Sequence, residues 1–334
     1  MSELLKAYFN FHGCAVEYST PDRDLASAIS FDFAAFASPP CEPRIKLEAL
    51  PQGLPIVLPP GRFKTRRWSV LESPPGRRLA WYPGGALCDY DYAGRSGTVL
   101  SLNRELLREL SYLLILSRAG EELDLRGLHR VHAAAAGFRG AALLFCGARG
   151  TGKTTLLLEL LKETEFSLLS DDTPLADAAG RVHPFPARIG LGLDSPHLAD
   201  FGGLRNFTRR QYPPKRLLDP AGAGFRISGA LPAGGIFLLR RGGAPRIAPA
   251  SPGAGAAELA VSLAAGYGTP QLAEYFLRLS AGDIAAKAGI LFSRLRAAAA
   301  LLRRARCYVF ELGPDRRANA AELRSFLRSG SAGA

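Results

Sequence analysis

Residues 147–154 read GARGTGKT, a full match to the pattern G-x-x-x-x-G-K-[ST]. Glycines let successive backbone N–H groups turn toward phosphate oxygens, and the start of the following helix adds a partial positive charge. Lys153 would reach the β- and γ-phosphates of a nucleotide, and Thr154 would bind Mg²⁺. We therefore expect ATP and Mg²⁺ as cofactors. The predicted phosphate-binding residues are Gly147, Ala148, Arg149, Gly150, Thr151, Gly152, Lys153, Thr154 and Thr155.

Two adjacent carboxylates, Asp171 and Asp172, follow the apolar run Leu168-Leu169, eighteen residues after Lys153. Neighbouring residues of a strand point to opposite sides, so one carboxylate could face a metal and the other an attacking hydroxyl. A hydroxyl-phosphorylating enzyme needs both, because Mg²⁺ requires oxygen ligands and the hydroxyl benefits from a positioned base. The alternative is an ordinary metal-binding aspartate followed by a turn-forming one.

His132 lies fifteen residues before Gly147, among alanines at the start of an expected strand. Taken alone, a histidine in that setting is more often a buried side chain with satisfied hydrogen bonds than a functional group. The functional interpretation depends on a resemblance.

The three segments Val131-His132-Ala133, Gly147 to Thr154 and Leu169 to Asp172 together resemble the HPr kinase/phosphorylase superfamily. The resemblance covers about residues 125–190. It implies an α/β catalytic domain of the HPr kinase / phosphoenolpyruvate carboxykinase type. The glycine-rich segment that serves phosphorylase activity in the bifunctional enzymes is absent. The chain is more similar to divergent HPr-kinase-like proteins, some of which phosphorylate a hydroxyl on a peptide.

The resemblance also implies roles for individual residues. Asp171 would be the base that takes the proton of the acceptor hydroxyl, and Asp172 and Thr154 would hold Mg²⁺. Lys153 would hold the phosphates, and His132 would help to orient the reacting groups. Thr154 stands where the family usually has serine, a chemically neutral exchange.

Hydrophobic spacing and turn residues predict the elements that position these groups. Before residue 98, short apolar runs interrupted by Pro and Gly are typical of strands and turns, and a helix is expected over 101–118 with Gly120 as its stop. Around the loop we expect strands at 131–138 and 142–146, a helix at 154–162 and a strand at 166–169. Later elements are expected at 235–239 (strand), 242–255 (loop), 284–306 (helix), 307–312 (strand) and 318–327 (helix).

Two basic segments have alternative interpretations. Along the helix at 284–306, Leu291, Leu295, Ala298 and Leu302 share one face, and we expect the arginines Arg294, Arg296, Arg303 and Arg304 to be solvated. The stretch from 205 to 216 is either a clamp for phosphate oxygens or a solvated loop. Its basic residues are Arg205, Arg209, Arg210, Lys215 and Arg216.

The alternation of strands and helices predicts the α/β class. We expect two domains: a β-rich N-terminal domain over 1–122, closed by a helix, and a P-loop, HPr-kinase-like catalytic domain over 123–334.

The composition of the chain limits which partners are expected. The net charge of +12 suits a phosphate-rich ligand, but no nucleic-acid-binding motif accompanies it, so we do not expect nucleic acid as a partner. No segment has the pattern of a secretory signal or a membrane span, so we expect a cytoplasmic protein without a membrane partner. A homo-oligomer is compatible with this sequence.

The expected function is an ATP-dependent kinase that transfers the γ-phosphate to a Ser/Thr hydroxyl of a peptide, protein or small-molecule acceptor. One alternative is a non-kinase P-loop ATPase or nucleotide-gated binding module. Another is a phosphotransferase or carboxykinase-like enzyme acting on a metabolite. Thr173-Pro174, which follows the aspartates, argues against a dedicated AAA-type ATPase, because such enzymes place a glutamate there.

Overall fold

A computed structural model describes residues 3–209, 213–265, 275 and 281–330, and it is a mixed α/β protein, as the sequence predicted. The described residues form two compact units. The first unit runs to Leu123 and includes residues of the ranges 207–214 and 270–285. The second unit holds residues of the ranges 124–206, 215–269 and 286 onward. Among the described helices, none is long and apolar enough to cross a membrane.

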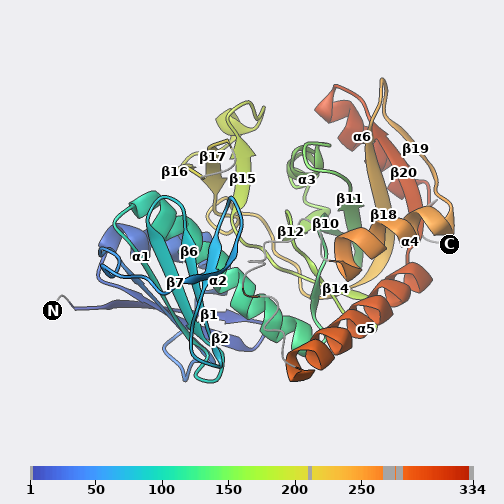
Figure 1. The fold of residues 1–334 in the computed structure, drawn as a ribbon. Helices are drawn as coiled ribbons and strands as arrows, with labels where there is room; N and C mark the ends of the chain where they lie inside the picture. The colour runs from blue at the N-terminus through green and yellow to red at the C-terminus, as the bar shows by residue number, and fades with distance from the viewer. Residues whose placement is uncertain (1–2, 210–212, 266–274, 276–280, 331–334) are drawn as a thin grey trace. The chain divides into compact units, whose positions relative to one another are not determined.

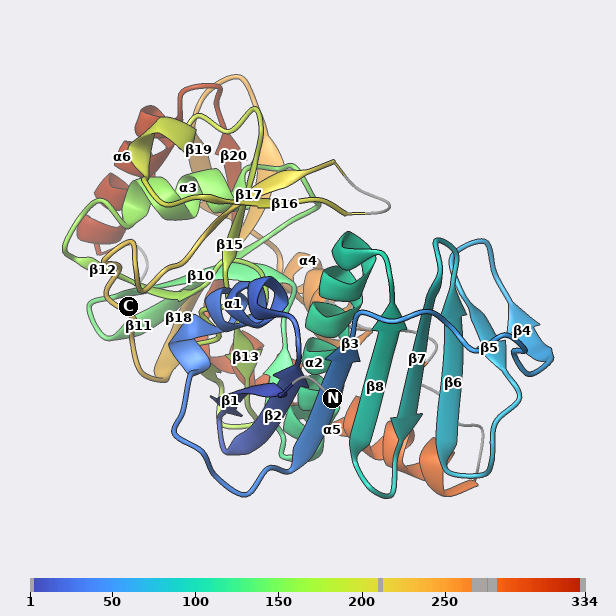
Figure 2. The ribbon, with the colours of Figure 1, turned by 90° about the vertical axis from the view of Figure 1, so that its left-hand side faces the viewer.

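The first unit is built on an eight-stranded sheet in the order β1-β2-β3-β8-β7-β6-β5-β4, whose strands lie side by side in Figure 2. His12 and Gly13 both have positive φ and form the tight turn between β1 and β2, as a two-residue hairpin requires. The strands are β1 (Leu5–Phe11), β2 (Cys14–Thr20), β3 (Ile45–Leu50), β4 (Gly61–Lys64), β5 (Ser69–Leu71), β6 (Arg77–Tyr82), β7 (Ala86–Asp91) and β8 (Ser96–Ser101). The helices are α1 (Arg23–Asp32) and α2 (Arg104–Leu125), with a 3₁₀ turn at Ala34–Phe36.

The end of α2 corrects one prediction. Gly120 was expected to stop this helix, but the helix continues to Leu125. Ala119 and Leu123 are both buried, so the apolar stripe runs on past the glycine. Burial of a leucine contributes about 2 kcal/mol, which exceeds the cost of about 1 kcal/mol for a glycine inside a helix.

The main sheet of the second unit has β12, β10, β11, β18, β20 and β19 as successive neighbours (Figure 1). β11, β18 and β20 are parallel, whereas β10 is antiparallel to both β11 and β12. The strands are β9 (His129–Arg130), β10 (Ala133–Phe138), β11 (Ala141–Cys146), β12 (Phe166–Ser170), β13 (Leu175–Ala176), β14 (Arg181–His183), β18 (Leu231–Arg241), β19 (Arg246–Pro249) and β20 (Arg306–Leu312). The short strands β14, β13 and β9 extend the sheet from the start of β18.

Helices cover both faces of this sheet. In β11, Leu143 and Phe145 pack into one cluster with α3 and α6, and the alternate residues Leu144 and Cys146 pack into a second cluster with α4 and α5. The result is a three-layer α/β/α arrangement. The helices are α3 (Lys153–Leu160), α4 (Pro252–Leu259), α5 (Ala281–Arg304) and α6 (Arg316–Arg328), with short turns at Leu198–Asp200 and Ala260–Ala264.

A small sheet joins the strands of the basic stretch, in the order β15-β17-β16. The strands are β15 (Ile189–Gly192), β16 (Arg205–Phe207) and β17 (Lys215–Leu218). The stretch is therefore strand in two places rather than an unpatterned loop. Arg210, one of its predicted basic residues, lies outside the described residues.

Arg294 on α5 is buried, contrary to the prediction that it is solvated. Its guanidinium donates to Asp124 through Nε, at 3.1 Å, and through Nη2, at 2.6 Å. Asp124 also lies 2.9 Å from Nδ1 of the buried His129. The sequence could not show this, because the partner carboxylate is 170 residues away.

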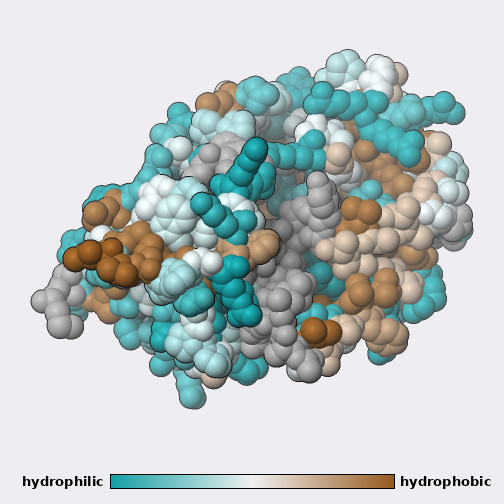
Figure 3. Space-filling view, viewed as in Figure 1, coloured by the Kyte–Doolittle hydropathy of each residue, from teal (hydrophilic) through white to brown (hydrophobic). Residues whose placement is uncertain are grey.

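The rotation of α5 follows from this burial. Ala297 and Leu301 pack on the same face as Arg294, whereas Leu291 and Leu295 are 48% exposed. Figure 3 shows the molecule from the same side as Figure 1, and its surface is brown, the colour of hydrophobic residues, along the course of α5.

Arg294→Met should destabilise the protein by about 3–5 kcal/mol, because it leaves Asp124 ionised, buried and without its bidentate partner. Arg296→Met, at an exposed position of the same helix, should change the free energy of unfolding by less than about 0.5 kcal/mol. Urea unfolding of the two variants measures the difference. Equal stability of the two variants would contradict the buried pair.

Candidate active site

The glycine loop connects β11 to α3 and depends on the missing side chains of its glycines. Gly147, Gly150 and Gly152 all have positive φ, a region that other residues rarely adopt. A Cβ at Gly147 would also lie only 3.0 Å from the carbonyl oxygen of Leu239. Gly152 is the N-cap of α3 and has no side-chain cap, so the N–H groups of the first helical turn are directed to the loop interior.

Lys153 bridges this loop. Its buried Nζ donates to the carbonyl oxygens of Gly147 at 2.7 Å and Ala148 at 3.2 Å. Arg241, at the end of β18, donates to the carbonyl oxygen of Gly150 at 2.6 Å and ties the loop to the sheet. Arg149 is exposed at the outer side of the loop.

Ser170, the last residue of β12, shapes the turn that carries the aspartates. Its hydroxyl donates to the carbonyl oxygen of Phe185 at 2.9 Å and accepts from the backbone N–H of Thr173 at 3.1 Å. Oδ1 of Asp171 is a buried oxygen without a hydrogen-bond partner among the described residues. A buried acceptor of this kind is costly unless something fills it, so it marks a place where a ligand proton would be stabilised.

The two aspartates differ in acidity. Burial raises the pKa of Asp171 to about 6, and the neighbouring charge of Asp172 adds to the rise. The Asp172 side chain is 56% exposed, and its contact with Nδ1 of His132 favours the ionised form, so the pKa of Asp172 lies below its usual value. Environments that separate the pKa values of two neighbouring carboxyls allow one to accept a proton while the other stays ionised.

His132 lies directly before β10 and points to Asp172 rather than into a core. Its Nδ1 is 3.2 Å from Oδ1 of Asp172. The backbone fixes this approach, because the N–H of Ala133 donates to the carbonyl oxygen of Asp172 at 3.3 Å and that of His132 donates to Ser262 at 3.0 Å. The structure therefore brings together the predicted residues His132, Lys153, Asp171 and Asp172, and the Thr154 side chain favours ionisation of Asp171.

The site also contains Lys215, which the sequence motifs did not distinguish from the other basic residues of its stretch. Lys215 on β17 exerts its positive charge on both Asp171 and Asp172. Other members of the basic stretch differ from it: Arg209 donates to the carbonyl oxygen of Pro213, and Arg205 is exposed on β16. Gly190 and Gly192 alternate along the strand that pairs with β17, but this pairing is visible only in the structure.

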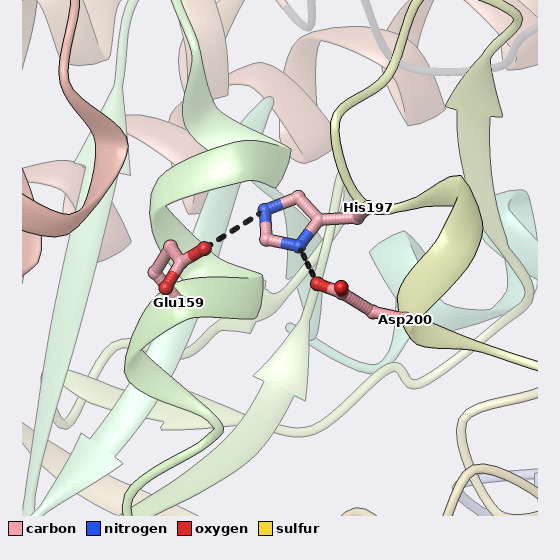
Figure 4. A group of neighbouring side chains, drawn as sticks. All are labelled: Glu159, His197 and Asp200. Carbon is pink, nitrogen blue, oxygen red and sulfur yellow. Dashed lines mark hydrogen bonds and ion pairs between the residues drawn. The ribbon is translucent and has the colours of Figure 1, made fainter.

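A second polar cluster joins α3, which carries Glu159, to the turn at Leu198–Asp200 (Figure 4). Glu159, His197 and Asp200 place possible ligand atoms within 4.8 Å of one another. Lys162 lies 3.1 Å from Glu159 and 3.0 Å from Asp200, and Arg316 lies 3.1 Å from Glu159. Because these cations already neutralise the carboxylates, we interpret the cluster as an ion-pair network that fixes α3 rather than as a metal centre.

An apolar pocket of about 900 Å³ opens at the amino end of β20. Leu302, Cys307, Tyr308 and Phe326 are among its lining residues. The glycine loop follows the carboxyl end of β11, which is parallel to β18 and so to β20. The pocket therefore lies away from the edge that carries the loop and the aspartates.

No known family model matches the chain, and no curated protein sequence is similar to it at a significant level. The case for a function therefore rests on the side chains of the site and their geometry.

Asp171→Asn should stabilise the protein without nucleotide or metal at pH 7.5, by about 2 kcal/mol. The folded protein holds the proton of Asp171 up to pH about 6, whereas the unfolded chain loses it near 3.8, so the stability of the wild type falls as pH rises through this window. Below pH 4 the gain should vanish. Urea unfolding at pH 4 and 7.5 measures both values.

Asp172→Asn is the matched control, since the pKa of Asp172 is shifted in the opposite direction. Its ionised form is favoured by folding, so this variant should lose stability at pH 7.5. A loss of stability at pH 7.5 in both variants would contradict the difference between the two carboxyls.

Proposed function

We propose that the protein is an ATP-dependent kinase that transfers the γ-phosphate of ATP to a Ser/Thr hydroxyl of a peptide, protein or small-molecule acceptor. The observation that carries this proposal is the buried, unpartnered oxygen of Asp171, a carboxyl of raised pKa beside a glycine loop and an ionised second aspartate. A loop for phosphates needs no such base for binding alone, whereas a hydroxyl acceptor does.

The second unit would be a P-loop kinase domain of the HPr kinase / phosphoenolpyruvate carboxykinase type. Supporting features are the antiparallel β10 between β11 and β12, with His132 at its head, and the aspartate pair at the end of β12. The oxygens of Thr154 and Asp172 suit Mg²⁺, which prefers hard oxygen ligands. When bound, the ion would neutralise charge on the phosphates.

Each residue would contribute one part of the transfer. Asp171 accepts the hydroxyl proton as the acceptor oxygen forms its bond to the γ-phosphorus and the bond from that phosphorus to the β–γ bridging oxygen breaks. Lys153 and the N–H groups of α3 stabilise charge on the phosphate oxygens. His132 keeps Asp172 ionised and oriented.

The wild type should transfer label from γ-labelled ATP to a degenerate peptide library that contains Ser and Thr, and not to a library in which both are replaced by Ala. Lys153→Ala should lower the transfer at least 100-fold, because one preorganised charge at the phosphoryl group is worth several kcal/mol. Arg296→Ala, at an exposed position of α5, is the control and should retain most activity. Label released only as inorganic phosphate, with both libraries unlabelled, would favour the ATPase alternative.

Substitution of the two aspartates should affect Mg-ATP binding and phosphoryl transfer differently. Asp171→Asn should bind Mg-ATP nearly normally and lose about 10²–10⁴-fold in kcat, whereas Asp172→Asn should mainly weaken the binding of Mg-ATP. Calorimetry and single-turnover transfer measure the two effects. If both variants lose metal binding to the same extent, the pair is a joint metal site and the assignment of a base is wrong.

A further inference from the structure

The pairing of β15 with β17 gives this hairpin two different faces. Directly opposed residues share a face, and the pairs are Ile189 with Leu218, Gly190 with Leu217, Leu191 with Arg216, and Gly192 with Lys215. Ile189, Leu191 and Leu218 pack into the core of the second unit. The opposite face carries Lys215, with Gly192 directly across from it and Gly190 diagonal to it, so neither of these two residues of β15 has a side chain that competes with it for space.

Gly190 determines where the Lys215 side chain lies. A Cβ added at Gly190 would be 2.8 Å from Cδ and 3.0 Å from Nζ of Lys215, closer than real Cβ contacts. The backbone of Gly190 is not in the left-handed region, so any residue could adopt its conformation. The end of the Lys215 side chain occupies the space beside Gly190, so a larger residue at this position would displace that side chain.

The hairpin is tied to the turn that carries the aspartates. The N–H of Phe185 donates to the carbonyl oxygen of Leu169 at 2.8 Å, and the Ser170 hydroxyl donates to Phe185 at 2.9 Å. β15 begins four residues after Phe185. Lys215 thus acts on the aspartates from the hairpin, while Lys153 acts on them from α3, and the charge of each lysine favours ionisation of both carboxyls.

We propose that Lys215 is a second phosphate-binding residue of the active site, which contacts the γ-phosphoryl group of the nucleotide, and that Gly190 is its positioning residue. The inference rests on the proposed kinase function. A phosphoryl group in transfer lies between the loop and the base, with charge spread over its three equatorial oxygens. Lys153 would meet those oxygens from the loop, and Lys215 would meet them from the β15–β17 hairpin. A lysine that only neutralised the aspartates would not distinguish ATP from ADP.

Lys215→Met tests the contact through binding, without an acceptor. With Mg²⁺ present, the variant should bind a non-hydrolysable ATP analogue at least 10-fold more weakly than the wild type, while its affinity for ADP changes less than about 3-fold, since only the analogue carries a γ-phosphate. Arg216→Met, on the other face of the same strand, should alter neither affinity. Calorimetry measures the affinities of the wild type and of both variants for the analogue and for ADP. Equal effects on the analogue and ADP, or no effect on either, would overturn the inference.

Gly190→Ala keeps the lysine but displaces the end of its flexible side chain, so it tests the site even if Lys215→Met folds poorly. It should reproduce the selective loss of analogue affinity, and the double variant should be no weaker than Lys215→Met alone. Gly202→Ala, where a Cβ meets nothing within 4 Å, is the matched control. Unchanged analogue affinity in Gly190→Ala, or additive losses in the double variant, would remove Gly190 from the positioning role.

The failure of this inference is distinguishable from that of the proposed function. If the wild type labels no hydroxyl-bearing peptide, yet Lys215→Met loses affinity selectively for the analogue, the kinase proposal fails and the contact of Lys215 with the γ-phosphate stands. If the wild type labels the peptides and Lys215→Met keeps its preference for the analogue over ADP, only the role of Lys215 is wrong.

Discussion

The candidate site depends on the direction of one strand. β10 runs antiparallel between β11 and β12, with Ala133 opposite Cys146 and Ala135 opposite Ser170. The start of β10 and the ends of its two neighbours therefore lie at the same edge of the sheet. Short connections then suffice to place His132, the glycine loop and the aspartates together, without any long excursion of the chain.

This convergence concentrates charge in a small volume, and the packing around it keeps the charges in place. Burial raises the pKa of Asp171, whereas the pKa of the more exposed Asp172 is lowered, because His132 is close to it. On the other side, α3 is fixed by apolar contacts from Leu156 to Leu160 and by the ion pairs of Glu159. Repulsion between like charges held close together destabilises the folded state, and the packing of the rest of the fold offsets this destabilisation.

Sequence reasoning succeeded where the information is local. The elements around the loop are found within a few residues of their predicted bounds, because strand, glycine turn and helix each have their own periodicity or turn residues. It failed where burial depends on distant partners, as for Arg294 and Asp124, and where packing overrides a local signal, as at Gly120. Lys215 could not be separated from its basic neighbours, since its distinction comes from Gly190 across a strand pair.

The hydrogen bonds that Lys153 makes to Gly147 and Ala148 also affect which ligands can bind, because a ligand must interact with Lys153 more favourably than these two carbonyl groups do. An anion that enters the loop competes with two internal acceptors for the same ammonium group. A single small anion offers little beyond what the loop carbonyls already provide, whereas a chain of linked phosphates replaces both and also engages the backbone N–H groups of α3. Under the proposed function, this competition within the protein would favour polyphosphates over simple anions.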